Sequence, residues 1–424
     1  MATELSTRKT ILMIALDFPP CQSAGVQRTY KFAQYLQDFG WDVVVLTVKA
    51  SVYQQTDAAA GCPDVLHIER CAALDAARDL SWRGKYLGFS CVPDRWWSWA
   101  LTAIPAGKRL IKQYQPDLIW STYPVSTAHY IGYRLQRFSG LPWIADYRDP
   151  LQCRYDASAR RYSGIAKWIE QQTIRYCQKA VFTTENAARL YHRLYADEPL
   201  SKFAVIENGF DEANFQGLPA RAPRQDQRFI LLHSGALYGQ GRDPSELYHA
   251  LALLQQQGLI DQDNFALHFR GFEGTAEQHA LLQQLGISTL VHFLPGVPYL
   301  ESLAEMGQAD ALLLIQGPLF NNQIPSKLYD YIRTGRPVLA VTPDKGSTYQ
   351  TLQPLEHCHC ASGVQAVAEA LQQQIMAQQR VQQNPVDAVA DSQGILPADQ
   401  VPAAIAAYSR YERTRQLAQL LAEL

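Results

Sequence analysis

Short, almost continuously apolar runs recur along the chain, each closed by turn residues and separated from the next by a helical or irregular stretch. The pattern begins with TILMIALDF and WDVVVLTV, which flank an amphipathic stretch over 26–39 that ends at Gly40. Runs without polar alternation are typical of parallel strands that are buried on both faces. Four further runs of the first half are PDLIWSTYP, LPWIADYRDP, KAVFTTE and KFAVIENGF. The sequence therefore predicts an α/β protein built from strand–helix–strand units.

The same pattern restarts after DEANFQGLPARAPRQDQR, a stretch at 211–228 that is rich in proline, glycine and charge. The apolar runs that follow are FILLHSGAL, FALHFRGF, LVHFLPGV, ADALLLI, RPVLAVT and HCHCAS, with a helical stretch in PSELYHALALLQQQG. The break indicates a linker between two similar domains. We expect two Rossmann-like, doubly wound domains, 1–210 and 229–400, facing each other across a cleft. A terminal amphipathic helix over 401–424 should dock back on the first domain.

Composition limits the classes of function. The 424 residues suit two domains, and 47% hydrophobic and 18% charged residues suffice for two cores. A net charge of −2 gives no basic excess for holding nucleic acid through its phosphates. The N-terminal apolar run has about seven residues, against the ~20 of a membrane span, so we expect a cytoplasmic chain. Eight cysteines without a CxxC pair predict reduced thiols and no metal site, and HCHC at 357–360 alternates like a strand.

Ligands of such sheets bind beyond the carboxyl ends of the strands, so the residues that follow strands are the candidates for a site. After the first strand, DFPPCQSAGVQR places Gly25 at the start of a helix, where backbone N–H groups can approach an anion. The loop lacks the G-x-G-x-x-G of a dinucleotide site. A plain strand-to-helix turn would explain this loop equally well.

A second candidate follows the strand in WIADYRDP, where Asp146, Arg148 and Asp149 fall within four residues. A helix cap and a surface ion pair would explain one carboxylate and the arginine. Three ionisable groups at one strand end nevertheless favour a site, and we assign them to catalysis or to the binding of a substrate on the side of the first domain. His129 could share that role, although a single histidine on a helix is more often packed or solvated.

The third candidate is IPSKLYDYIRTGRPVLAV at 324–341, which predicts a short helix with Pro325 near its first position and Lys327 in its first turn. A cation at the positive end of a helix is unfavourable unless an anion is bound, and a phosphate would supply one. Asp330 lies three residues later on nearly the same face, where a carboxylate can accept hydrogen bonds from ribose hydroxyls. Phosphate and ribose together indicate a nucleotide. The alternative is a helix that packs its apolar face on the core and leaves Lys327 in solvent.

The loop HSGALYGQGR supports the nucleotide interpretation. Gly235 and Gly239 free the backbone after a strand, and Arg242 adds a second cation. We count Gly235, Tyr238 and Arg242 among the nucleotide-sugar-binding residues.

The order of these segments resembles that of group 1 glycosyltransferases of family 4, which have the two-domain GT-B fold and use nucleotide diphosphate sugars. The segments that carry the resemblance run nearly from end to end: DFPP with AGVQR, STYPVSTAH, PWIADYRDP, NGFD, HSGALYGQGRDP, LPGVP and IPSKLYDYIRTGRPVLAV. The resemblance implies that Gly25 lies by the diphosphate, that Arg242 and Lys327 neutralise it, and that Asp330 holds the ribose.

The resemblance also places Ile324 and Pro325 near the nucleotide, and it implies that the loop with Gly296 and Val297 offers backbone to the base. One position departs from the family pattern, because Asn322 stands where the first acid of the E-x7-E pair would be. The family mostly retains the anomeric configuration without an undisputed protein nucleophile. Asn322 and nearby backbone are therefore expected to position the sugar, without a metal or another cofactor.

Three functions fit this resemblance. We expect the transfer of a hexose to a glycan or a lipid-linked acceptor, as in polysaccharide biosynthesis. The first alternative is a nucleotide-sugar 2-epimerase, an isomerase on the same fold that needs no acceptor. The second is a non-catalytic subunit that binds a nucleotide sugar, which the substitution at Asn322 makes credible.

A peripheral contact with the inner face of a membrane is a further expectation, from SCVPDRWWSWALTAIPAGKRLIKQY at 90–114. Aromatic rings close to cations suit the headgroup boundary of a bilayer. The aromatic residues are Trp96, Trp97 and Trp99, and the cations are Arg95, Lys108, Arg109 and Lys112. At helical spacing the same segment would instead bury a stripe formed by Trp97, Leu101, Ile104 and Leu110.

Overall fold

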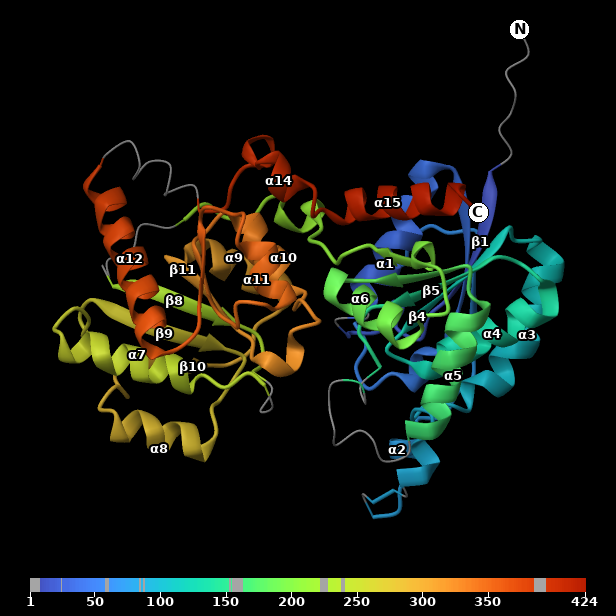
Figure 1. Cartoon of the computed structure of the whole chain (residues 1–424), viewed down its shortest axis with the longest axis horizontal. Helices are drawn as coiled ribbons and strands as arrows, with labels where there is room; N and C mark the ends of the chain where they lie inside the picture. The colour runs from blue at the N-terminus through green and yellow to red at the C-terminus, as the bar shows by residue number, and fades with distance from the viewer. Residues whose placement is uncertain are drawn as a thin grey trace, which may run out of the picture. The chain divides into compact units, whose positions relative to one another are not determined.

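The computed structural model describes residues 8–23, 25–57, 61–83, 85–86, 88–151, 154, 163–221, 228–237, 241–384 and 394–424. The chain divides into two compact units, each with one parallel sheet and helices on both faces (Figure 1). Unit 1 comprises Met1–Asn208 with Arg410–Leu424, and unit 2 comprises Gly209–Ser409. None of the helices in the described ranges combines the length and the apolar character needed to cross a bilayer.

Unit 1 contains seven strands and the helices around them. The strands are β1 (Lys9–Ile14), β2 (Trp41–Val48), β3 (His67–Cys71), β4 (Leu118–Tyr123), β5 (Trp143–Tyr147), β6 (Lys179–Phe182) and β7 (Phe203–Val205). The α-helices are α1 (Val26–Tyr35), α2 (Ala76–Asp79), α3 (Trp99–Tyr114), α4 (Ser126–Ser139), α5 (Ser163–Tyr176), α6 (Glu185–Leu194) and α15 (Arg410–Ala422), with the 3₁₀ turns η1 (Leu36–Phe39) and η3 (Gly88–Cys91).

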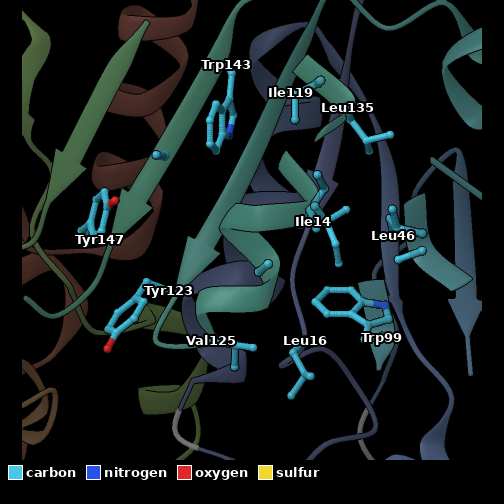
Figure 2. Close-up of a cluster of buried hydrophobic side chains, with 14 of the residues drawn as sticks. Ile14, Leu16, Leu46, Trp99, Ile119, Tyr123, Val125, Leu135, Trp143 and Tyr147 are labelled. Atoms are coloured by element: carbon cyan, nitrogen blue, oxygen red, sulfur yellow. The ribbon is translucent and has the colours of Figure 1, made fainter. Parts of the chain in front are cut away.

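The sheet of unit 1 is parallel throughout, in the order β3-β2-β1-β4-β5-β6-β7. Successive side chains of a strand point to opposite faces, which is why both layers are apolar. Ile14 and Leu46 belong to a core cluster that includes residues of α3, α4 and α5. Figure 2 shows them with Trp99 of α3 and Leu135 of α4. On the other face, Ile11 packs in the layer formed with α1, η1 and α15.

Unit 2 repeats this architecture. Its strands are β8 (Phe229–Ser234), β9 (Phe265–Arg270), β10 (Val291–Leu294), β11 (Ala311–Ile315), β12 (Val338–Val341) and β13 (Cys358–Ala361). Its helices are α7 (Ser245–Gln256), α8 (Ala276–Gln284), α9 (Tyr299–Gln308), α10 (Lys327–Thr334), α11 (Ser347–Leu352), α12 (Val364–Gln383) and α14 (Ala403–Ala406), with the 3₁₀ turn η7 (Glu212–Phe215). The strand order β10-β9-β8-β11-β12-β13 matches that of the first six strands of unit 1.

Every apolar run singled out in the sequence forms a strand, and Gly40 ends the first helical stretch with a φ of 82°. HCHC contributes three residues to β13, and the described residues hold no cluster of metal-ligating side chains. β3 is the strand that the sequence patterns do not predict. Its residues HIERC are mostly half-buried and largely polar, because β3 lies at the edge of the sheet.

The boundaries between the two units differ from those predicted from the sequence, which were a linker at 211–228 and a terminal helix at 401–424. Residues 209–221 belong to unit 2, where η7 forms and Phe215 is buried in the core, although they overlap the stretch interpreted as a linker. The terminal stretch 401–424 contains two helices, because α14 stays with unit 2 and α15 begins at Arg410 on unit 1. As expected, the terminal helix packs on the first domain, with the ring of Tyr411 5.3 Å from that of Tyr35.

Candidate functional site

The strand order of each sheet reverses direction once, between β1 and β4 in unit 1 and between β8 and β11 in unit 2. Doubly wound sheets bind ligands at this point, beyond the carboxyl ends of the strands. Gly25 follows β1, Gly235 follows β8, and Asn322 follows β11. The sequence therefore places its candidates at the two positions that the topology favours.

Lys327 is the first residue of α10, as the proline and the helical pattern predict. Its Nζ lies 3.1 Å from Nε2 of His233, at the carboxyl end of β8. The other ring nitrogen, Nδ1, donates to the carbonyl oxygen of Leu313 at 3.1 Å, so Nε2 accepts from the lysine. Burial, and then the charge of Lys327, holds the pKa of His233 well below its usual value. His233 was not among the residues predicted from the sequence. The available signal was its position directly before Ser234 and Gly235, at the end of an apolar strand.

The charge of Lys327 is not balanced by protein groups in the described ranges, where it has no carboxylate partner. Burial, and then the neighbouring charge of Arg242, lowers the pKa of Lys327 from its ordinary value of 10.5 to about 7. The guanidinium of Arg242 lies over the ring of Phe320, 5.2 Å from its centroid. Two cations repel each other here beside a neutral histidine, so an anion bound between them would be stabilised.

Three glycines form a surface without side chains next to this pair. Gly235 and Gly271 have φ values of 92° and 75°, in the left-handed region that favours glycine. A Cβ on Gly271 would lie 3.6 Å from Cα of Gly296 and 3.8 Å from Cα of Gly235. A Cβ on Gly235 would lie 3.3 Å from Nζ of Lys327. We call Gly235, Gly271 and Gly296 the glycine floor; it exposes backbone beside the ammonium group, where a ligand can approach closely.

The loop that carries Gly296 and Val297 is fixed from the neighbouring strand. Arg270, the last residue of β9, donates through Nη1 to the carbonyl oxygen of Pro295 at 2.9 Å. The rest of its guanidinium pairs with Glu305 on α9, at 2.5 Å. Arg270 was not among the sequence candidates, because nothing in FALHFRGF distinguishes it from a solvated arginine.

Asp330 lies on α10 with its carboxylate only partly buried. The hydroxyl of Tyr299, at the start of α9, donates to its Oδ1 at 3.1 Å. One carboxylate oxygen is thus held by a residue of α9, the helix that follows the loop at 295–297, and this hydrogen bond orients the carboxylate without adding a positive charge. The other carboxylate oxygen has lone pairs that can accept hydrogen bonds from hydroxyl groups, and the ribose contact of Asp330 stays a prediction.

The loop between β11 and α10 carries Asn322, Ile324 and Pro325. It is tied to the buried amide of Gln316, whose Nε2 donates to the carbonyl oxygens of Phe320 at 3.0 Å and of Gln323 at 2.8 Å. Ile324 is buried in the core under α10, and the carbonyl of Pro325 accepts from Leu328 in the first turn. Tyr238 lies outside the described residues.

In unit 1, Asp146 is fully buried and cannot meet a substrate. Arg28 on α1 forms an ion pair with it at 2.7 Å and also donates to the carbonyl oxygens of Ile206 and Glu207. The hydroxyl of Thr122 donates to the other carboxylate oxygen at 2.8 Å. The catalytic assignment of Asp146 is therefore replaced by a structural one: the pair joins α1, β5 and the end of β7.

Arg148 is also held within unit 1. Its Nε donates to the carbonyl of Tyr123 at 2.6 Å, its Nη1 to the carbonyl of Gly25 at 2.5 Å, and its Nη2 lies 3.2 Å from Asp17. A Cβ on Gly25 would collide with Asp17 and with Arg148, which explains the glycine at the start of α1. Arg148 thus positions the loops of unit 1 at the switch point, the place between β1 and β4 where the strand order reverses. The contact of Gly25 with diphosphate stays a prediction.

His129 is packed in the core of unit 1. Its Nδ1 lies 2.8 Å from the hydroxyl of Ser121, and its ring is 4.6 Å from that of Tyr147. Burial lowers its pKa to about 3, so it stays neutral. The packed alternative therefore describes His129, and a catalytic role does not. Asp149 is only partly buried at the carboxyl end of β5 and is the one residue of the predicted group that keeps access to solvent.

Comparison with known proteins was made by family, by sequence and by structure. Residues 24–209 match the family described as the glycosyl transferase 4-like domain. A search among curated proteins found no match. A sucrose-phosphate synthase from Thermosynechococcus elongatus shares the fold with a TM-score of 0.64 and 16% identity, over 98% of this chain and 99% of that chain.

Two further solved structures are similar over nearly the whole chain. WaaG, a glycosyltransferase involved in lipopolysaccharide biosynthesis, gives a TM-score of 0.58 at 14% identity, over 97% of this chain and 99% of that chain. A UDP-N-acetylglucosamine 2-epimerase gives 0.52 at 11% identity, over 97% and 95%. At these identities the similarity concerns the fold.

Proposed function

Because the chain is a GT-B protein whose first unit carries a glycosyltransferase 4-like domain, we propose that it transfers a hexose from a nucleotide diphosphate sugar to a glycan or a lipid-linked acceptor, with retention of the anomeric configuration. The observation that carries this proposal is the cation pair of unit 2 beside the glycine floor, at the switch point of a doubly wound sheet. A diphosphate would supply a negative charge for Lys327, which has no carboxylate partner among the described residues.

Under this proposal, the diphosphate, the ribose, the base and the sugar of the donor each contact residues of unit 2. Lys327 and Arg242 neutralise the diphosphate, which makes a metal ion unnecessary for that purpose. Asp330 accepts the ribose hydroxyls, and the backbone of the loop at 295–297 meets the base. Asn322 and its neighbouring amides position the sugar without attacking it, because an amide has no nucleophilic oxygen comparable with a carboxylate.

On the side of unit 1, we assign Asp149 to the acceptor or to proton transfer. It is the candidate acid that combines a strand-end position with access to solvent, whereas Asp146 and His129 are buried. Arg148 and Gly25 act as positioning residues for the loops around it.

A panel of nucleotide diphosphate sugars tested by thermal shift identifies the donor, since a ligand that binds only the folded state raises the midpoint by an amount that follows RT ln(1 + [L]/Kd). We expect one base and one class of sugar to stand out. Lys327→Met should abolish the shift, and Lys345→Met is the matched control, because Lys345 is an exposed lysine of the same unit. A shift that survives in Lys327→Met would overturn the phosphate assignment.

The 2-epimerase is a second candidate because a protein of that class shares the fold. Incubating the protein with the donor alone, followed by NMR of the sugar, separates the two functions. Release of nucleoside diphosphate that depends on an acceptor supports transfer. Formation of the 2-epimer without an acceptor refutes it, and binding without turnover over an acceptor panel supports the non-catalytic subunit.

A further inference from the structure

Large hydrophobic side chains are exposed along one stretch of unit 1, from the end of α2 to the start of α3. Trp82 is 79% exposed, Phe89 64% and Leu101 68%. Leu80, Tyr86 and Trp97 are exposed between them. We call these six residues the aromatic edge. Figure 1 shows α2 and the turns after it projecting from unit 1, away from the strands of its sheet.

The aromatic edge differs from the segment that the sequence indicates. Trp99 is fully buried in the core (Figure 2), Arg109 pairs with Glu69, and the ammonium of Lys108 lies over the ring of Phe138. These residues are engaged within unit 1. Leu101, which the helical pattern would bury, faces solvent instead. The exposed apolar surface is therefore centred before α3 and extends toward α2.

Hydrogen bonds and ion pairs fix both ends of this stretch. The carboxylate of Asp75 pairs with Arg95 and caps α2. Asp94 accepts from the backbone N–H of Thr127 at the start of α4, at 2.7 Å. The indole of Trp97 donates to the carbonyl of Ser90 at 2.8 Å. The side chains of the aromatic edge are therefore exposed to water unless a partner covers them.

The charges around the edge indicate what that partner is. Arg78 pairs with Asp79, and Arg95 with Asp75, so these charges cancel. Arg83 and Lys85 are exposed on the turn after Trp82, where backbone hydrogen bonds link Trp82 and Lys85. Neither has a carboxylate partner among the described residues. The edge thus presents two uncompensated cations between projecting aromatic rings.

We propose that the aromatic edge binds the surface of a lipid bilayer that contains anionic lipids. Tryptophan and tyrosine prefer the boundary between headgroups and acyl chains, and nearby cations are attracted by anionic headgroups. A turn that carries an almost fully exposed tryptophan suits insertion into a soft medium, whereas a folded partner needs a broad complementary surface. The aromatic edge contains none of the residues that we assign to the nucleotide site.

Co-sedimentation of the full chain with phosphatidylcholine vesicles, with and without phosphatidylglycerol, tests this. The wild-type protein should bind the vesicles that contain phosphatidylglycerol, less at high salt because screening weakens the attraction. Trp82→Ser with Phe89→Ser should lower the partition coefficient about tenfold or more. Arg83→Ala with Lys85→Ala should lower binding to the anionic vesicles and leave binding to neutral ones unchanged. Leu200→Ser is the matched control, because Leu200 is a 66% exposed leucine elsewhere in unit 1.

Three outcomes would overturn the proposal. The first is no binding of the wild-type protein to either vesicle at low salt. The second is an equal loss of binding in Leu200→Ser. The third is a change of molecular mass of Trp82→Ser with Phe89→Ser in analytical ultracentrifugation, which would assign the edge to contact between copies of the chain. Donor binding measured on the same variants keeps this test separate from the proposed function, since it should be unchanged.

Discussion

Raising the pH should weaken donor binding through a single lysine. Burial and the charge of Arg242 lower the pKa of Lys327 to about 7 in the ligand-free protein. Only the ammonium form attracts the diphosphate fully, so binding above this pH requires the uptake of a proton. The protonated fraction falls from roughly 90% at about pH 6 to roughly 1% at about pH 9. The dissociation constant should rise on the order of 100-fold over this range, equivalent to about 2.7 kcal/mol.

Stability should change in the opposite direction. Since the pKa of Lys327 in the folded protein is depressed from its ordinary value of 10.5, the unfolded chain holds more protons between about pH 7 and that value. The contribution of Lys327 to the free energy of unfolding therefore rises with pH in this window. A fall in donor affinity over the same window would therefore not come from destabilisation of the folded protein through Lys327.

Isothermal titration calorimetry with the best donor of the panel, in buffers of different ionisation enthalpy, measures both the affinity and the proton uptake. Lys327→Arg is the decisive control, because a guanidinium stays charged over the whole range and should flatten the profile. Lys327→Met should bind weakly at every pH. A wild-type profile that is flat, or a slope that persists in Lys327→Arg, would refute the assignment of the titrating group.

Four other changes test the remaining assignments. Arg28→Met should lower the free energy of unfolding by about 3–5 kcal/mol in urea, because Asp146 stays buried without its partner, and Arg28→Met with Asp146→Leu should restore most of it; a double variant as unstable as the single one contradicts this. Asp330→Asn should raise the donor Kd with an unchanged thermal midpoint of the free protein, whereas unfolding would make Asp330 structural. Gly235→Ala should weaken donor binding, since a left-handed φ is strained for alanine and its Cβ approaches Lys327. Asp149→Ala should lose turnover while donor binding stays near normal. A loss of donor affinity like that of Lys327→Met would show that Asp149 contacts the donor, which contradicts its assignment to the acceptor or to proton transfer.

The fold of two Rossmann-like domains is confirmed, and it was predictable because of the strands. Residues 24–209 also match a glycosyl transferase 4-like domain, which agrees with the resemblance. Runs such as WDVVVLTV and ADALLLI have no polar alternation, and only a sheet covered on both faces buries them. β3 was not predicted because an edge strand is half-exposed, and its residues are therefore a mixture of polar and apolar types. The helix around Lys327 was predictable for another reason: proline before it and Gly335 after it, at a φ of 75°, mark both ends.

The partners of charged residues could not be predicted in the same way. Arg28 and Asp146 are separated by 118 residues, and only the parallel sheet brings α1 beside β5. The pattern in WIADYRDP shows three ionisable groups at a strand end but does not reveal which of them is buried. His233 and Lys327, 94 residues apart, meet for the same topological reason.

The two switch points nevertheless treat their charges differently, and this difference favours unit 2 as the place of the donor. In unit 1 the guanidinium of Arg28 is balanced by Asp146, and that of Arg148 is bound by Asp17 and two carbonyls. An anionic ligand bound at the switch point of unit 1 would lie beside the carboxylates of Asp17 and Asp146. In unit 2 the ammonium of Lys327 meets a neutral imidazole and a second cation over bare backbone. Without a ligand, the pKa of Lys327 is lowered, and a bound diphosphate would raise it again. We therefore attribute the unbalanced ammonium of unit 2 to the proposed binding of diphosphate, and the ion pairs of unit 1 to the stability of the fold.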